Sequence, residues 1–209
     1  MNITVVVPPP VEPITLAEAY AHLRWDTELE GSPAEVVYPL GDLVQRNITS
    51  ARIFVEQATR RALVMQKLRL STASFSGIEL LRPPFISLES VEYFNDASVA
   101  TPLDLVDFFT TDDEVPRLRA YSRVFEGARD LSCWREDAIR VEYWAGYAPT
   151  YNTDSPPTVT SYTDNVPAGL KDAILLHVQL LCDRFDANEK ADLERTRDAL
   201  ISSYRVHTF

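Results

Sequence analysis

The sequence has few of the residues from which common catalytic and metal sites are built. Its 209 residues include six glycines, two cysteines and three histidines. It contains no glycine-rich loop of the kind that cradles a phosphate, and no Gly-x-Ser-x-Gly nucleophile elbow. Neither the Cys-x-x-Cys nor the His-Glu-x-x-His spacing of metal ligands occurs. We therefore predict that the chain is not an enzyme and has no catalytic residues, no cofactor and no metal.

Basic residues are in the minority. There are 20 Lys and Arg against 31 Asp and Glu, which gives a formal net charge of -11 and a pI near 4.7. Binding nucleic acid through its phosphates requires a clustered basic face. The charge therefore argues against that function. It suits a surface that must not adhere to DNA, or simply an acidic protein kept in solution by its charge, which is the commoner case.

The sequence lacks a long hydrophobic run and a basic N-terminal start. The longest apolar run, from Ala173 to Cys182, is interrupted by His177 and Gln179 and is too short to cross a bilayer. Residues 1–7 carry no Lys or Arg and lead into prolines, unlike a signal peptide. Cys133 and Cys182 are far apart, and we expect two reduced thiols. We expect a cytoplasmic protein without membrane contact.

The longest amphipathic pattern lies in residues 40–64 and predicts a helix. Its polar positions include Arg46, Arg52 and Arg60, and Asp42 is the expected N-cap. The pattern changes to alternation at residues 62–65, so the helix is expected to lead directly into a strand. The apolar positions recur at intervals of three and four residues: Leu40, Leu43, Val44, Ile48, Ala51, Phe54, Val55 and Ala58.

Further helices are expected on both sides of a β-rich region. Thr15 and Glu18 have the spacing of a capping box, which begins a helix that runs to about residue 24. Two more helices are predicted, one beginning at Pro167 and one covering residues 189–204, and His177 on the first is read as a hydrogen-bonded core residue. Residues 26–39 and 148–165 are predicted to be loops.

Short strands are expected at roughly ten-residue spacing between residues 65 and 147. They include residues 103–110 and 118–125, and the clearest is 139–147. This pattern favours a small antiparallel sandwich or barrel-like sheet. Residues 3–7 are expected to form either a short strand or an extended arm that the following prolines hold away from the body.

The strands also carry aromatic residues, which leaves an alternative open. A β-sandwich that binds carbohydrate or protein can present aromatic side chains on one face, although strand aromatics more often fill the core. The residues concerned are Tyr93, Phe94, Phe108, Phe109, Tyr143, Trp144 and Tyr147.

Four stretches, taken in order, resemble the head–tail connector (adaptor, or head-completion) proteins of tailed bacteriophages. Two residues depart from that pattern. Arg61 stands where the family has the glycine of a helix-ending Thr-Gly-Arg, so the helix is expected to run on, and Trp144 replaces a small polar residue. The stretches are Glu12-Pro-Ile-Thr-Leu-Ala-Glu-Ala19 with His22-Leu-Arg24, Leu43 to Val64, Ile139 to Tyr147, and Val166 to Leu176.

The resemblance implies an α+β fold in which N- and C-terminal helices form a bundle with an inserted antiparallel β-sandwich-like subdomain. The expected parts are an extended arm (1–13), the bundle (14–64 and 165–205), the β-rich insertion (65–148) and a short C-terminal tail (206–209).

The resemblance also implies a structural role in the virion, at the junction of capsid and tail. Twelve copies, made in the host cytoplasm, would form a ring under the portal protein. The ring would extend the channel, let double-stranded DNA pass without specific binding, and offer a platform to a tail terminator or stopper protein.

Three sets of residues are expected to make the contacts of such a ring. We predict that Tyr204, Arg205 and Phe209 dock on the portal. We also predict that the acidic segment with Glu28, Glu30 and Glu35 faces the channel or a neighbouring subunit. The basic positions Arg46, Arg52 and Arg60 of the long helix are expected to meet an acidic neighbour.

Overall fold

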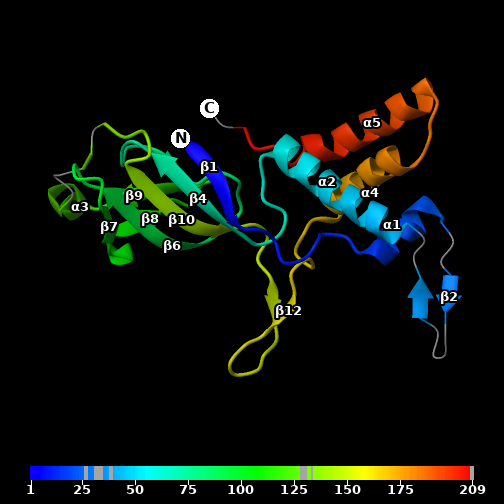
Figure 1. Ribbon diagram of the computed structural model, residues 1–209, viewed down its shortest axis with the longest axis horizontal. Helices are drawn as coiled ribbons and strands as arrows, with labels where there is room; N and C mark the ends of the chain where they lie inside the picture. Colours follow the sequence, from blue (N-terminus) through cyan, green and yellow to red (C-terminus); the bar gives the residue numbers. More distant parts are fainter. Residues whose placement is uncertain (26–27, 31–34, 38–39, 128–130, 133, 208–209) are drawn as a thin grey trace. The chain divides into compact units, whose positions relative to one another are not determined.

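The chain folds into two compact units (Figure 1). The computed structural model describes residues 1–25, 28–30, 35–37, 40–127, 131–132 and 134–207. Unit 1 comprises Met1–Pro10, Arg60–Tyr162 and Val206–Phe209, and unit 2 comprises Val11–Thr59 and Thr163–Arg205. The expectation of α and β elements with antiparallel sheets is confirmed.

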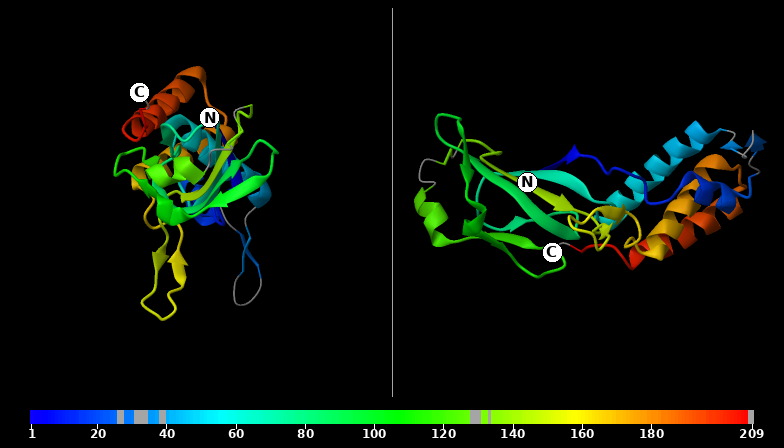
Figure 2. Two further views of the ribbon diagram at one scale, coloured as in Figure 1. Left: turned by 90° about the vertical axis from the view of Figure 1, so that its left-hand side faces the viewer. Right: turned by 90° about the horizontal axis from the view of Figure 1, so that it is seen from below.

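Unit 2 is built from four helices that pack against one another (Figure 2): α1 (Leu16–Leu23), α2 (Gly41–Thr59), α4 (Ala168–Cys182) and α5 (Ala187–Ser202). The capping box of α1 is confirmed, because the Glu18 amide donates to Thr15 Oγ1 and the Thr15 amide donates to the Glu18 carboxylate. Asp186 and Glu189 form a second capping box, so α5 begins two residues before the predicted start.

Helix α2 begins and ends differently from the prediction. The amides of Leu43 and Val44 both donate to the Leu40 carbonyl, so Asp42 lies inside the first turn rather than at the cap. There its carboxylate still favours the helix through the dipole. The helix does not run on, because Arg60 has a φ of 58° and ends it in the left-handed conformation that glycine adopts most easily. Arg60, and not Arg61, therefore stands at the position where the family's helix-ending glycine is expected.

Unit 1 contains a five-stranded and a three-stranded antiparallel sheet whose buried side chains belong to one hydrophobic core. Its buried residues include Leu68, Leu70, Val141 and Tyr143 from the larger sheet and Leu118 from the smaller. The five-stranded sheet has the order β1 (Asn2–Val7), β4 (Gln66–Thr72), β10 (Ile139–Ala145), β6 (Phe85–Phe94) and β7 (Ala100–Leu103). The three-stranded sheet has the order β5 (Ile78–Glu79), β9 (Arg117–Ala120) and β8 (Phe108–Thr110).

The N-terminal segment is a strand and not an arm held away from the body. Strand β1 pairs with β4 from Asn2 to Val7, with an irregularity between Val5 and Val7. The strand was one of the two alternatives that the sequence left open. The backbone hydrogen bonds of β4 on this side are satisfied by β1, which is why the segment joins the sheet.

Four segments fold differently from their predictions. Residues 28–30 and 35–37 pair as β2 (Glu28–Glu30) and β3 (Glu35–Val37), and β11 (Thr150–Tyr151) pairs with β12 (Val159–Ser161). Both segments were predicted to be loops because their composition has a low strand tendency, whereas backbone pairing does not require apolar side chains. A 3-10 turn, Leu105–Asp107, divides the strand predicted at 103–110, because Asp104 caps the turn by accepting from the Val106 amide. Residues 121–125 leave the strand pattern for helix α3 (Ser122–Gly127).

Gly146 occupies the tightest backbone position in unit 1. Its φ is 119°, and its amide donates to the Pro84 carbonyl over 2.8 Å. A Cβ at this position would lie 2.5 Å from the Val64 carbonyl oxygen and 2.8 Å from the Met65 amide nitrogen. Only glycine fits, because both obstacles are backbone atoms that form part of the Val64–Tyr147 bridge region.

The substitution Gly146→Ala should therefore lower the free energy of unfolding by at least about 3 kcal/mol, measured by denaturant titration. Gly77→Ala is the matched control. Gly77 also has a positive φ of 66°, but a Cβ there meets nothing within 4 Å. The control substitution should lower the free energy of unfolding by about 1–2 kcal/mol. Equal losses for the two variants would contradict this account of Gly146.

Candidate functional site

The candidate site residues of α2 do not lie together. Arg46 and Arg60 are exposed, whereas Arg52 is only 8% exposed. Arg52 Nε donates to Glu12 Oε2 over 2.7 Å and Arg52 Nη1 donates to Glu56 Oε2 over 2.9 Å. Arg52 thus forms both of these ion pairs within its own chain. Its assignment to a surface that meets a neighbouring subunit is corrected.

Glu12 connects the segment after the prolines to the middle of α2. Its second carboxylate oxygen accepts from Thr49 Oγ1 over 2.8 Å, while Arg52 holds the first. Glu56 is 3% exposed. These interactions form a buried charged cluster, Glu12–Arg52–Glu56, within unit 2. The Arg52–Glu56 spacing of four residues was visible in the sequence as a helical ion pair, but the contribution of Glu12 was not.

His177 forms part of a second polar cluster in unit 2. Its ring stacks on Phe54 with the centroids 4.2 Å apart, and Arg197 Nη1 lies 2.8 Å from His177 Nδ1. Arginine can only donate, so this nitrogen accepts and the imidazole is neutral. Burial and the nearby Arg197 charge lower the pKa of His177. The predicted hydrogen bond of His177 is present, but its ring is only half-buried, so its placement in the core is not confirmed.

The residues predicted to dock on the portal have contacts within unit 2. The Tyr204 ring lies against Gly169, where a Cβ would be 3.2 Å from its hydroxyl oxygen. Arg205 Nε donates to the Ala58 carbonyl over 3.1 Å. Val206 in the C-terminal tail is only 2% exposed. Phe209 lies outside the described residues.

The acidic residues Glu28, Glu30 and Glu35 are placed by the backbone of one hairpin. Strand register puts Glu30 directly opposite Glu35, and Glu28 opposite Val37. Figure 1 shows that this hairpin projects from the helices of unit 2.

The solvent-facing side of the five-stranded sheet carries a network of ion pairs. Glu142 lies 2.9 Å from Lys67 Nζ and 2.6 Å from Arg69 Nη2. These hydrogen bonds overcome the effect of burial, which acts in the opposite direction, and lower the pKa of Glu142. Trp144 Nε1 donates to Glu89 over 2.9 Å, so this departure from the family pattern takes part in the polar face.

The aromatic residues of the strands do not form a single binding face. Tyr93, Phe94, Phe108 and Tyr143 are at most 8% exposed and belong to the interior. Phe109 is 46% exposed and lies on the outer face of the smaller sheet. It is joined there by Tyr121, whose ring centroid is 5.2 Å away. The sequence singled out Phe109 among the strand aromatics but not Tyr121, although alternation from Arg117 to Tyr121 does place every second residue on that face.

Neither a metal site nor a membrane span is found in the part of the chain that the structure describes. No group of three or more His, Cys, Asp or Glu residues there is arranged to hold a metal ion, and no helix is long and apolar enough to cross a bilayer. Cys182 is a free thiol that accepts from Asn47 Nδ2 over 3.2 Å. Cys133 lies outside the described residues.

The fold is similar to that of solved chains from a phage-like particle. A chain in the neck of an empty gene transfer agent particle, computed with C6 symmetry, matches with a TM-score of 0.72 and 20% identity. A chain of the native gene transfer agent virion matches with a TM-score of 0.69 and 20% identity, and one from the native neck, computed with C12 symmetry, with 0.64 and 19%. Each match covers 100% of this chain and 97% of the other. No family model and no curated protein matches.

These likenesses define the class of fold to which the chain belongs. It is a fold of neck and virion chains in gene transfer agent particles, and it extends over the whole chain. The resemblance to head–tail connector proteins, which rested on four short stretches of sequence, is confirmed at the level of the fold.

Replacing Arg52 should be costly because it removes the cation that pairs with the buried Glu56 and the partly buried Glu12. We expect Arg52→Met to lower the free energy of unfolding by about 3–5 kcal/mol. Arg46→Met on the exposed face of the same helix should change it by less than about 0.5 kcal/mol. Denaturant titration at neutral pH measures both. A loss below 1 kcal/mol for Arg52→Met would show that the cluster does not hold the segment to α2.

The neutral His177 predicts a pH dependence of stability. The pKa of His177 is lower in the folded protein than in the unfolded chain. Below about pH 6.5, the unfolded chain therefore binds a proton at this residue more readily than the folded protein does. Stability from this residue is complete above that pH and is lost as the pH falls towards the lowered pKa. His177→Gln keeps a neutral acceptor for Arg197 and does not titrate. Between pH 7.5 and pH 5 the free energy of unfolding should fall more steeply for the wild type than for His177→Gln. Parallel curves for the two proteins would contradict the prediction.

Proposed function

We propose that this chain is a structural head–tail connector of a tailed-phage-like particle, with no catalytic role. The observation that carries the proposal is the likeness of the whole chain to a chain from a particle neck, with a TM-score of 0.72. A match across nearly the full length of both chains includes the helices and the sheets together. In this proposal the helices of unit 2 are the bundle, and residues 65–148 are its sandwich-like β insertion.

The proposed assembly is a ring of twelve copies beneath the portal protein, with a tail terminator or stopper on its other side. The necks that contain the similar chains were computed with C6 and C12 symmetry, which supports a ring. A head-to-tail contact between identical copies closes into such a ring when the rotation divides the circle evenly.

The charge of the chain supports a channel wall rather than a DNA-binding surface. A net charge of -11 repels phosphates, so double-stranded DNA would slide past without being held. In this proposal the hairpin with Glu28, Glu30 and Glu35 faces either the channel or a basic surface of a neighbour. The exposed Arg46 and Arg60 of α2 are the basic residues proposed to face an acidic neighbour.

The portal contact is proposed for the last residues of the chain, with Tyr204 and Arg205 acting from within unit 2. Tyr204 packs on Gly169 and Arg205 donates to the Ala58 carbonyl at the end of α2, so both residues are anchored in unit 2. Phe209 would then supply the apolar anchor.

Deletion of residues 207–209 tests the portal contact while leaving the buried Val206 in place. Co-purification of the tagged protein with the portal ring should fall at least tenfold, because an interface loses most of its affinity with its anchor. Arg195→Ala, on the exposed face of α5, is the control and should bind the portal normally. If the deletion variant binds the portal as well as the wild type does, residues 207–209 do not make the portal contact. Failure of the wild type to bind any portal would contradict the proposed function.

A further inference from the structure

The smaller sheet of unit 1 carries an exposed patch of the composition found in protein interfaces. Leu105, Val106, Phe109 and Tyr121 are 36%, 64%, 46% and 50% exposed. Such residues contribute binding energy when a contact buries them, whereas exposed to water they promote aggregation. We define the aromatic patch as these four residues with Arg119 and Arg123.

The members of the aromatic patch are held together by specific contacts. Phe109 and Tyr121 are 5.2 Å apart between ring centroids, and the Arg123 guanidinium lies 5.5 Å from the Tyr121 ring. Arg123 also forms an ion pair with Asp107 and donates to the Val106 carbonyl. These contacts fix the side chains before any partner arrives, which lowers the entropy that binding would cost.

Arg119 gives the aromatic patch a positive charge. It lies opposite Phe109 in the strand register and is exposed. The neighbouring Arg117 and Arg123 are paired with Glu79 and Asp107, whereas no hydrogen bond or ion pair of Arg119 is found among the described residues. An arginine beside two exposed aromatic rings is the composition of an interface hot spot that binds a carboxylate.

A complementary surface lies elsewhere on unit 1. The turn between β8 and β9 carries the exposed Asp112, Asp113 and Glu114, and borders a hollow of about 400 Å³. Pro83, Pro84 and Phe85 line the other wall. We call this the proline groove. It offers the partly exposed rings of Pro84 and Phe85 to an aromatic side chain, and carboxylates to an arginine.

The shape of the proline groove is fixed by hydrogen bonds within the turn. Thr111 Oγ1 accepts from the Arg117 amide over 2.9 Å and donates to Asp113 over 2.8 Å. Arg61 forms an ion pair with Glu114. Asp112 has no hydrogen bond or ion pair with any other residue that the structure describes. Asp112 is therefore a carboxylate available to an incoming cation.

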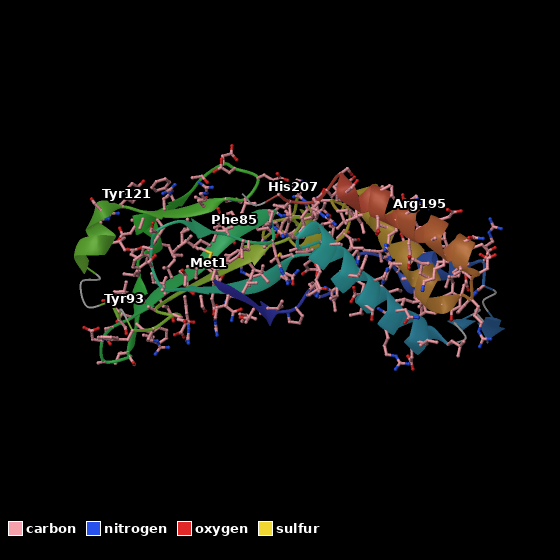
Figure 3. The ribbon with its side chains drawn as sticks, turned by 90° about the horizontal axis from the view of Figure 1, so that it is seen from above. Met1, Phe85, Tyr93, Tyr121, Arg195 and His207 are labelled. Atoms are coloured by element: carbon pink, nitrogen blue, oxygen red, sulfur yellow. The ribbon has the colours of Figure 1, made fainter. Side chains whose placement is uncertain are left out.

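The aromatic patch and the proline groove are separate surfaces of the same unit. The patch lies where β8 begins and β9 ends, whereas the groove lies at the turn that joins the two strands. In Figure 3, Tyr121 lies at one end of unit 1 and Phe85 lies well away from it. A patch cannot fold back onto the groove of its own chain across a rigid sheet, so the two can meet only between copies.

We propose that the aromatic patch of one copy docks in the proline groove of the next. Tyr121 and Phe109 would pack on the rings of Pro84 and Phe85, and Arg119 would pair with Asp112. Because the two surfaces differ, the contact is head-to-tail and produces a ring or a filament rather than a closed dimer. The proposal rests on the ring of the proposed function and names the surfaces that build it.

A charge exchange in the full-length protein tests the contact. Arg119→Asp and Asp112→Arg should each weaken self-association about tenfold in sedimentation velocity, because each places like charges in contact. An equal mixture of the two variants should associate again, since every patch then finds a groove of opposite charge. That rescue is specific to a head-to-tail contact between these two residues.

The aromatic side chains are tested with a matched pair of variants. Tyr121→Ala should weaken self-association at least tenfold, whereas Tyr151→Ala, which removes a ring that is 55% exposed on β11, should not. Asp96→Arg is the control for charge reversal at an exposed site. Both controls should associate as the wild type does.

Two results would overturn the proposal. If the wild type associates and the variants at Arg119, Asp112 and Tyr121 associate equally well, the ring is built by other surfaces and the proposed function stands. If the wild type does not associate at any concentration, the contact is overturned. The connector role is then decided separately by co-purification with the portal.

Discussion

The buried ion cluster of Glu12, Arg52 and Glu56 is the constraint on which unit 2 depends. A charged arginine that is 8% exposed is tolerable only because two carboxylates neutralise it. Desolvation makes such a cluster a weak source of net stability, but it strongly disfavours any arrangement that leaves one member unpaired. It therefore fixes the register of residues 11–15 on α2. Through that segment it sets where α1 begins, since Thr15 caps the helix only three residues later.

Local chemistry accounts for the parts of the fold that the sequence predicted well. Period-3.6 patterns located α2 and α4, and the Thr15–Glu18 capping box located the start of α1. Strict alternation located β4 and β10, whose alternate residues are buried. In each case the residues that determine the element lie within the element, so the sequence contains the signal.

The errors arose where distant partners decide the structure. The helical pattern predicts that Arg52 is polar and faces solvent. In the structure it is buried, because Glu12, forty residues earlier, neutralises its charge. The hairpins β2–β3 and β11–β12 form through backbone pairing that leaves little trace in hydrophobic patterning. The aromatic patch depends on the return of β9 beside β8. The sequence places Arg119 and Tyr121 on one face but cannot reveal that Phe109 lies opposite Arg119.

A connector role agrees with the distribution of chemistry over the molecule. The ionisable residues form structural pairs, as around Arg52 and Glu142, and His177 is held neutral by Arg197. The surfaces left for partners are exposed apolar and charged patches. The proposed ring would use these patches to hold copies together, while the excess negative charge of the chain keeps DNA from adhering to it.

An electron cryomicroscopy reconstruction of the neck of a particle that contains this chain tests the central claim most directly. The account predicts a ring of this fold between the portal and the tail, in which one subunit's Tyr121 lies against the Phe85 of the next. Absence of the fold from the neck would contradict the connector role itself.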